Sequence, residues 1–97
     1  MKIGGFDWDN GNWPKCGKHG LSKSQIESIF DGDVRVLDDS SDRDEEHRYR
    51  GIGKDGDDRY TFIVFCLRRK NRLTLLRPVS ARYMHAKEVR HLEQQKA

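Results

Sequence analysis

The spacing of apolar residues is helical in the first third of the chain and alternating after it. Ile26, Ile29 and Phe30 recur at intervals of three and four, so they share one face of a helix. Ser22 and Gln25 precede them with the spacing of a capping box, and a glycine between two aspartates follows. This pattern predicts a helix that starts after Ser22 and stops just past Phe30.

A shorter helix is predicted upstream, over residues 12–20. Pro14 falls in its first turn, where the missing N–H costs little, and Gly20 lies just past its end. Later in the chain, alternation of apolar and polar residues predicts extended segments, separated by turns rich in glycine, asparagine and aspartate. These segments are 34–37, 48–52, 60–67 and 72–79.

The last two strands and the C-terminal segment have further features. The segment 60–67 is apolar on both alternating faces, so we expect a central strand covered on both sides or nearly so. Pro78 lacks a ladder donor, so the strand 72–79 is expected to lie at an edge or to fray there. Ser80 can cap a final helix over 81–94, and its residues expected to face the sheet are Met84, His85, Val89 and Leu92.

The order of elements is therefore two N-terminal helices, about four strands in a meander, and a C-terminal helix. It predicts a small single α+β domain over residues 1–97 with a mainly antiparallel sheet. The tail 94–97 carries no packing signal and is expected to be flexible. No internal repeat or linker divides the chain.

The net charge is only +3, but the charges are separated along the sequence. Between Leu67 and His91 there are eight Arg or Lys residues against one acid. Between Asp31 and Glu46 there are eight acids against two arginines. A basic region of this kind attracts phosphate-rich polymers, because neutralising phosphates releases counterions. The charge map predicts RNA or DNA as a partner.

Other classes of protein fit the sequence poorly. No signal peptide is recognisable, and no apolar run approaches the length of a membrane span. Cys16 and Cys66 are too few and too far apart for a disulfide framework, so we expect a cytoplasmic protein with reduced thiols and no membrane contact. Cys16 and His19 have the spacing of half a zinc site, but no second ligand pair follows. We expect neither a metal nor a cofactor.

Four arginines are candidates for a phosphate clamp. Arg48 and Arg50 are two residues apart, so in a strand they project from one face. If Arg77 and Arg82 lie beside them, the four guanidinium groups could hold a phosphodiester and neutralise the extra charge of its transition state. The alternative is that these arginines pair with the acids of residues 38–46 as an ordinary solvated face.

RNA cleavage also needs a base for the 2′-OH proton and an acid for the departing 5′-oxygen. A histidine suits either task, and His19, next to Lys18, is the candidate, although a lone histidine is more often a surface or capping residue. Glu88 is expected to orient an arginine rather than to act as a base, because neighbouring cations would depress its pKa. Tyr83 is a candidate for nucleic-acid contact.

Taken together, these stretches resemble the BrnT family of bacterial toxins. The resemblance runs from Phe6 to about Glu88, in the same order and at similar spacings. Each motif is weak alone, but their succession is quite specific. The matching stretches are Phe6-Asp-Trp-Asp9, Lys18-His-Gly20, the helix that ends at Phe30-Asp31, Glu46-His-Arg-Tyr49, Gly51-Ile-Gly53, the apolar strand after Arg59, and Val79-Ser-Ala-Arg82.

The resemblance implies a RelE-like fold and a small, metal-independent ribonuclease toxin that arrests translation. It also implies RNA as substrate and a BrnA-like antitoxin of the ribbon-helix-helix type, through which alone the toxin would meet DNA. Carried over by position, the catalytic residues implied are His19, Lys18, Arg48, Arg82 and Glu88. The candidates for RNA binding are Arg50, Arg77, Lys15 and Tyr83.

The chain departs from the family between Asp9 and Lys18, where the family has a longer helical stretch that contains a lysine. Lys15 can replace that lysine. Met84 stands where a small residue is common, which changes helix packing rather than chemistry. The missing lysine favours the alternative function, a non-catalytic module that binds nucleic acid or an acidic protein with a degenerate toxin fold.

Overall fold

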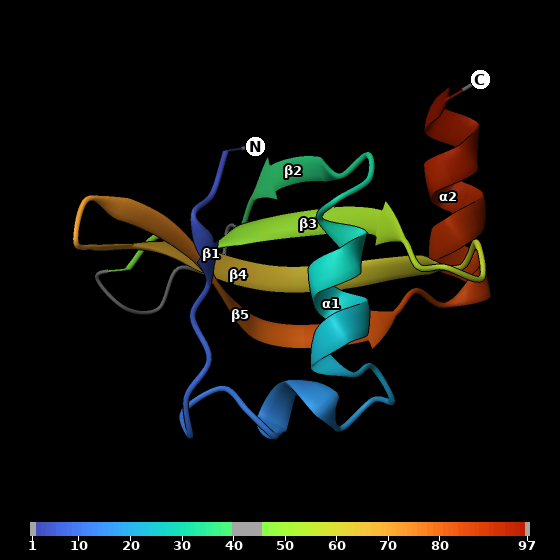
Figure 1. Ribbon diagram of the computed structural model, residues 1–97. Helices are drawn as coiled ribbons and strands as arrows, with labels where there is room; N and C mark the ends of the chain where they lie inside the picture. The colour runs from blue at the N-terminus through green and yellow to red at the C-terminus, as the bar shows by residue number, and fades with distance from the viewer. Residues whose placement is uncertain (1, 40–45, 97) are drawn as a thin grey trace.

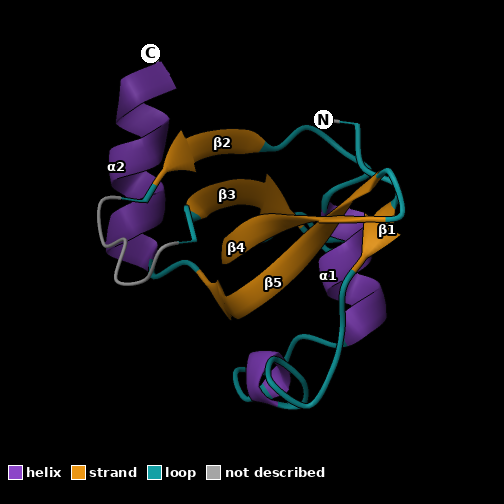
Figure 2. Ribbon diagram, turned by 90° about the vertical axis from the view of Figure 1, so that its left-hand side faces the viewer, coloured by secondary structure: helices purple, strands orange, loops and turns teal. Residues whose placement is uncertain are grey.

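The computed structural model of the chain describes residues 2–39 and 46–96, and Figure 1 shows their path. Within these residues there is one five-stranded sheet with α-helices packed on both sides. The elements in chain order are β1 (Gly5–Phe6), the 3₁₀ helix η1 (Lys15–Gly17), α1 (Lys23–Ile29), β2 (Arg35–Asp38), β3 (Tyr49–Lys54), β4 (Tyr60–Lys70), β5 (Leu73–Tyr83) and α2 (Ala86–Lys96). Figure 2 shows the sheet between α1 and α2, which cover opposite faces.

Strands β2 to β5 form the antiparallel meander that the sequence predicts. In addition, β1 pairs in parallel with β5, so the strand order among the described residues is β1-β5-β4-β3-β2. The expectation of about four strands is therefore one short, because a strand of two residues is too short to show alternation. The fold class is α+β, with a mixed sheet.

The capping box of α1 is present as predicted. The Ser22 side chain accepts a hydrogen bond from the Gln25 N–H at 3.1 Å, and Gln25 Oε1 accepts one from the Ser22 N–H at 2.8 Å. Ile26 and Ile29 are buried. The helix predicted over 12–20 is much shorter, a single 3₁₀ turn at η1.

The C-terminal helix begins later than the sequence predicts. Strand β5 continues to Tyr83, so Ser80 lies within a strand and α2 starts only at Ala86. The reason is long-range: β4 is equally long, and ladder pairs such as Ile63 with Ala81 outweigh the local capping signal of Ser80.

Four residues were expected to face the sheet from this helix, and two of them do. Leu92 is buried and Val89 is half-buried. Met84 instead lies in the connection before α2, and His85 is exposed at the start of the helix. Because α2 continues to Lys96, the tail that we expected to be flexible is helical as far as that residue.

Strand β5 is an edge at Pro78, as expected, because β1 pairs only with Leu75 and Leu76. The register between β4 and β5 shifts here, since Val64 pairs with Ser80 but the next residue of β4 pairs with Pro78. One extra residue of β5 therefore forms a β-bulge. Because of this extra residue, the β5 side chains before the bulge point to the faces opposite to those that unbroken alternation from the end of the strand would give.

The main core lies between α1, η1 and one face of the sheet. Its buried cluster is Cys16, Leu21, Ile26, Ile29, Ile63 and Ala81. A Cβ atom at Gly53 would lie 3.0 Å from Ile29 Cγ2, so the glycine allows α1 to pack closely on β3. On the other face, Phe62 and Val64 are only half-buried. The prediction that residues 60–67 are covered on both sides is thus correct for one face and only partly correct for the other.

Candidate nucleic-acid interface

The face of the sheet opposite α1 carries many arginines. Residues that pair across neighbouring strands point to the same face, so the register assigns each side chain. One row across β2, β3, β4 and β5 consists of Arg35, Ile52, Phe62 and Arg82, and the next consists of Leu37, Arg50, Val64 and Ser80. We call this surface the arginine face, and the arginines that the register places on it are Arg35, Arg50, Arg68, Arg77 and Arg82.

The bulge in β5 brings Arg77 and Arg82 to the same face. These residues are five apart, and regular alternation would direct them to opposite faces. The register pairs Arg77 with Cys66 and Arg82 with Phe62, two residues of β4 that share one face. Three arginines of the predicted clamp, Arg50, Arg77 and Arg82, therefore lie on one surface. Arg48 directly precedes β3 and is not part of the paired register.

Arg82 is held by three groups. Its Nη1 and Nη2 atoms donate to Glu88 Oε1 and Oε2 at 2.8 and 3.0 Å, a bidentate pair. Nη1 also donates to the Tyr83 carbonyl at 3.2 Å, and the guanidinium lies 4.7 Å from the centre of the Phe62 ring. Arg82 therefore links the end of β5 to the first turn of α2.

Glu88 is fully charged at neutral pH. The hydrogen bonds from Arg82 and from the His85 N–H lower the pKa of Glu88 to about 2. A carboxylate with this pKa is a weak general base, which agrees with the expectation that Glu88 orients an arginine.

Arg77 is also paired with carboxylates. Its guanidinium donates to both oxygens of Asp9 at 3.0 and 2.9 Å, and Nη1 lies 3.5 Å from Asp7 Oδ2. Only 11% of the Arg77 side chain is exposed. The hydrogen bond from Arg77 is the main cause that lowers the pKa of Asp9. In this arrangement, few N–H groups of the Arg77 guanidinium remain to bind a phosphate.

Asn12 fixes the N-terminal segment that supplies these aspartates. Its Nδ2 donates to the carbonyls of Asp7 and Pro78 at 2.9 and 2.8 Å, and its Oδ1 accepts from the Asp9 N–H at 2.9 Å. Asn12 is almost fully buried. This residue, which the sequence pattern did not single out, joins the start of the chain to β5.

Arg50 lies at the centre of the arginine face and is less strongly paired. Its Nη2 donates to the backbone carbonyl of Asp38 at 3.2 Å, and its buried Nε has no hydrogen-bond partner. Arg68, by contrast, donates to Glu46 at 3.0 and 3.3 Å. Of the four predicted clamp arginines, Arg77 and Arg82 thus pair with acids outside the segment 38–46, and Arg50 bonds only a backbone carbonyl of that segment. Residues 40–45 lie outside the described part of the chain.

Four sequence-predicted site residues lie away from the arginine face. Lys15, Lys18 and His19 are exposed in and after η1, which packs with α1 on the opposite face. The Tyr83 ring also packs against that core, and the Arg59 guanidinium lies 4.0 Å from its centre. The structure therefore does not bring these side chains together with Arg82.

The structure adds two residues that the sequence analysis did not select. Arg35 lies on the same face and in the same row as Arg82, but on the edge strand β2. His91, one turn after Glu88 on α2, lines a hollow of about 380 Å³ together with Glu88 and Phe62. The spacing of three between Glu88 and His91 could have indicated a shared helix face.

The described residues contain no group of three or more His, Cys, Asp or Glu side chains that could hold a metal ion. Both cysteines are buried and free. In the same part of the chain, neither α-helix is long and apolar enough to cross a membrane.

Comparison with known proteins assigns the family. The family described as the ribonuclease toxin BrnT of type II toxin–antitoxin systems matches residues 8–88. No curated protein sequence matches the chain. The family match covers most of the sequence and confirms the resemblance found in its motifs. The chain therefore belongs to the BrnT family of ribonuclease toxins, whose type II systems pair a toxin that acts on RNA with a protein antitoxin.

Proposed function

We propose that this protein is an active endoribonuclease that cleaves RNA across the arginine face and thereby arrests translation. The observation that carries the proposal is the gathering of arginines from four strands, distant in sequence, on one sheet surface. Guanidinium groups fixed in this way favour the extra negative charge of a pentacoordinate phosphate, and they need no reorganisation during the reaction.

In the proposed mechanism, the scissile phosphate binds to Arg50 on the arginine face, on the side of its row that adjoins the row of Arg35 and Arg82. Arg50 donates to the Asp38 carbonyl through Nη2, so the N–H groups of its Nη1 remain for a phosphate oxygen. Arg48, two residues before it, and Arg82, in the neighbouring row, would add positive charge. Proton transfer by side chains would contribute about 10²- to 10⁴-fold, without a metal ion.

Two histidines compete for the proton-transfer role. His19, with Lys18, matches the family motif but lies on the α1 side of the sheet. His91 lies beside Glu88 on the arginine face. Separate replacement of each histidine by alanine decides between them: the variant that loses cleavage of a defined RNA, with unchanged RNA affinity, identifies the group. Loss in neither variant would exclude both histidines.

A second candidate function is a non-catalytic module that binds nucleic acid or an acidic protein. The observation that favours it is the pairing of two predicted clamp residues with carboxylates, Arg77 with Asp9 and Arg82 with Glu88. In such a module these pairs would be purely structural. Binding to RNA would then depend on Arg50 and its neighbours without any cleavage.

Incubation of purified protein with RNA in excess EDTA separates the two functions. Cleavage by the wild type that is lost in Arg50→Ala supports the metal-independent nuclease. The control is Arg69→Ala, which removes the same charge from an exposed residue on the other face of β4. Binding without cleavage by the wild type supports the module, and equal activity of both variants would remove Arg50 from the site.

We also propose that the antitoxin is BrnA-like, with a ribbon-helix-helix DNA-binding domain, so that the toxin meets DNA only through it. The family supplies the support, since type II systems pair toxin and protein antitoxin. The test is the neighbouring reading frame, expressed together with this chain. Its product should suppress growth arrest and co-purify with the toxin, and failure to do either would refute the assignment.

A further inference from the structure

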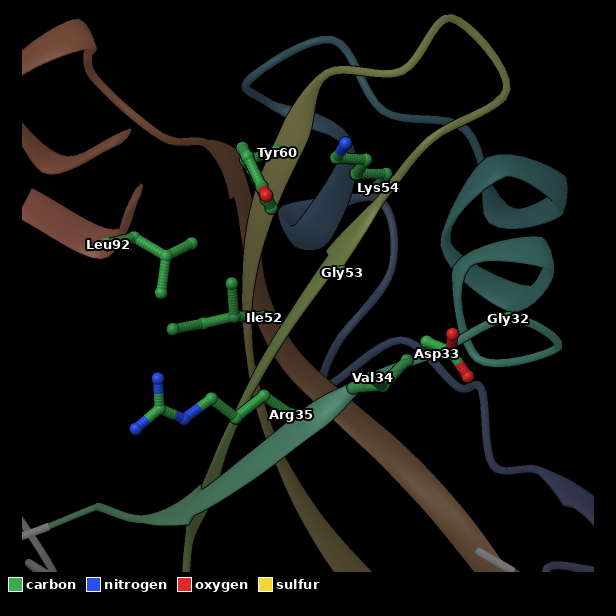
Figure 3. A pocket seen from close by; sticks show the side chains of 9 residues that line it. All are labelled: Gly32, Asp33, Val34, Arg35, Ile52, Gly53, Lys54, Tyr60 and Leu92. Carbon is green, nitrogen blue, oxygen red and sulfur yellow. The ribbon is translucent and has the colours of Figure 1, made fainter. Parts of the chain in front are cut away.

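A pocket of about 630 Å³ lies where β2 and β3 meet α2, at the end of the arginine face. Figure 3 shows Ile52 and Leu92 pointing toward each other across it, with the Arg35 guanidinium on one side and Tyr60 on the other. Asp33 lies beyond Val34, away from Leu92 (Figure 3). The volume is within the range of small-ligand sites, which are mostly apolar with a few placed polar groups.

The walls of the pocket combine apolar, aromatic and cationic groups. Ile52 and Leu92 supply apolar surface, and Tyr60 supplies a ring. Lys54 lies 4.9 Å from the centre of that ring and pairs with Asp58 at 3.2 Å, so its ammonium is already held in place. Arg35 is exposed and, among the contacts of the described residues, its side chain has no partner. Arg35 is thus the cation available to a ligand.

The pocket is continuous with the proposed phosphate site. Arg35 pairs with Ile52 in the ladder, and the next pair on the same face is Leu37 with Arg50. Arg35 and Arg50 are therefore diagonal neighbours on one face, with their Cα atoms about 7–8 Å apart. A single RNA strand whose phosphate binds Arg50 would place its next nucleotide over Arg35.

We propose that this pocket is a nucleotide subsite for the residue of the RNA that neighbours the clamped phosphate. The base lies against Ile52, Leu92 and the Tyr60 ring, and Arg35 binds the flanking phosphate. This inference rests on the proposed function and adds a place where base preference can arise. An apolar and aromatic floor suits a nucleobase, whereas a site for phosphate alone would need no such floor.

Binding is tested by NMR on ¹⁵N-labelled full-length protein with adenosine and uridine 5′-monophosphates, and with inorganic phosphate as the comparison probe. The nucleotides should shift the amide signals of Ile52, Gly53 and Leu92, and phosphate at the same concentration should not. In Arg35→Ala the nucleotide affinity should fall about tenfold, while Arg35→Lys keeps part of it. Equal shifts from phosphate and nucleotides, or no shifts at these residues, would overturn the subsite.

Kinetics on RNA give an independent readout. Arg35→Ala should raise KM about five- to tenfold and leave kcat nearly unchanged, because Arg35 binds a non-reacting nucleotide. Arg69→Ala should change neither. If the wild type does not cleave RNA, the proposed function fails, and the NMR titration still decides whether the pocket binds nucleotides. If the wild type cleaves RNA and Arg35→Ala is indistinguishable from it, only the subsite fails.

Discussion

At the scale of single residues, the arginine face is organised by charge pairs rather than by free cations. The paired guanidinium groups of Arg77 and Arg82 have fixed positions, whereas Arg50 and Arg35 have capacity for a ligand. Arg77 and Arg82 are held by carboxylates and have a structural role, whereas Arg50 and Arg35 keep guanidinium N–H groups that can bind a phosphate. We therefore expect the effects of substitutions to differ between the two groups.

The pair of Arg82 and Glu88 should make stability depend on pH. The pKa of folded Glu88 is about 2, below its ordinary value of 4.5. The pair therefore contributes stability above about pH 4.5, and this contribution is lost as pH falls toward 2. In urea unfolding, the difference between wild type and Glu88→Gln should be constant above pH 5 and should vanish near pH 2. The control is Glu93→Gln, an exposed acid of the same helix, and a difference independent of pH would contradict this account.

Asn12 should be important for stability although it is far from any proposed chemistry. Asn12→Ala removes the donor that Asn12 supplies to the buried carbonyls of Asp7 and Pro78. We expect a loss of about 2–3 kcal/mol in the free energy of unfolding, measured with urea. Asn10→Ala, at an exposed neighbouring position, is the control. A loss below about 0.5 kcal/mol would mean that water replaces the amide.

At the scale of elements, α1 and α2 differ in how they are attached. Helix α1 buries Ile26 and Ile29 in the main core. Among its described side chains, α2 has one buried residue, Leu92, and hollows of about 380, 470 and 630 Å³ adjoin the helix. Helix α2 is thus the weakly packed element of the fold.

Truncation of these two helices' buried residues should have different effects. Leu92→Ala should lower hydrogen-exchange protection in α2 only, because the main core does not include this residue. Ile26→Ala removes a core side chain and should destabilise the whole domain by about 2–5 kcal/mol. Hydrogen exchange followed residue by residue distinguishes local from global opening. A uniform loss of protection in β4 after Leu92→Ala would show that α2 is integral to the core.

At the scale of the whole molecule, the sheet separates a core side from a basic side. The helices α1 and η1 cover one face, and most arginines of the strands lie on the other, which α2 covers only at one end. RNA binding to such a surface is driven largely by the release of counterions. The affinity should therefore depend steeply on salt.

The salt dependence can be measured with a 2′-O-methyl RNA, which lacks the nucleophile and is not cleaved. In plots of log Kd against log salt concentration, Arg50→Ala should reduce the slope by about 0.7, the contribution of one phosphate contact in a single strand. Arg69→Ala should leave the slope unchanged. A wild-type affinity that is insensitive to salt would argue against phosphate binding on this face.

Much of the fold and the family was decided by local pattern. The capping box and apolar stripe specify α1, and the alternation after residue 33 specifies the four strands of the meander, because these signals depend only on near neighbours. The order of weak motifs identified the family over most of the chain.

Other features were decided only by contacts between distant segments. Strand β1 exists because β5 offers it a partner, and β5 runs past Ser80 because β4 continues beside it. The β-bulge turns Arg77 to the face of Arg82, which no local period predicts. The placement of His19 on the opposite side, and the pairing of arginines with Asp9 and Glu88, also follow from packing. Ladder hydrogen bonds and ion pairs between remote residues leave no periodic trace in a single sequence, so only the tertiary structure determines them.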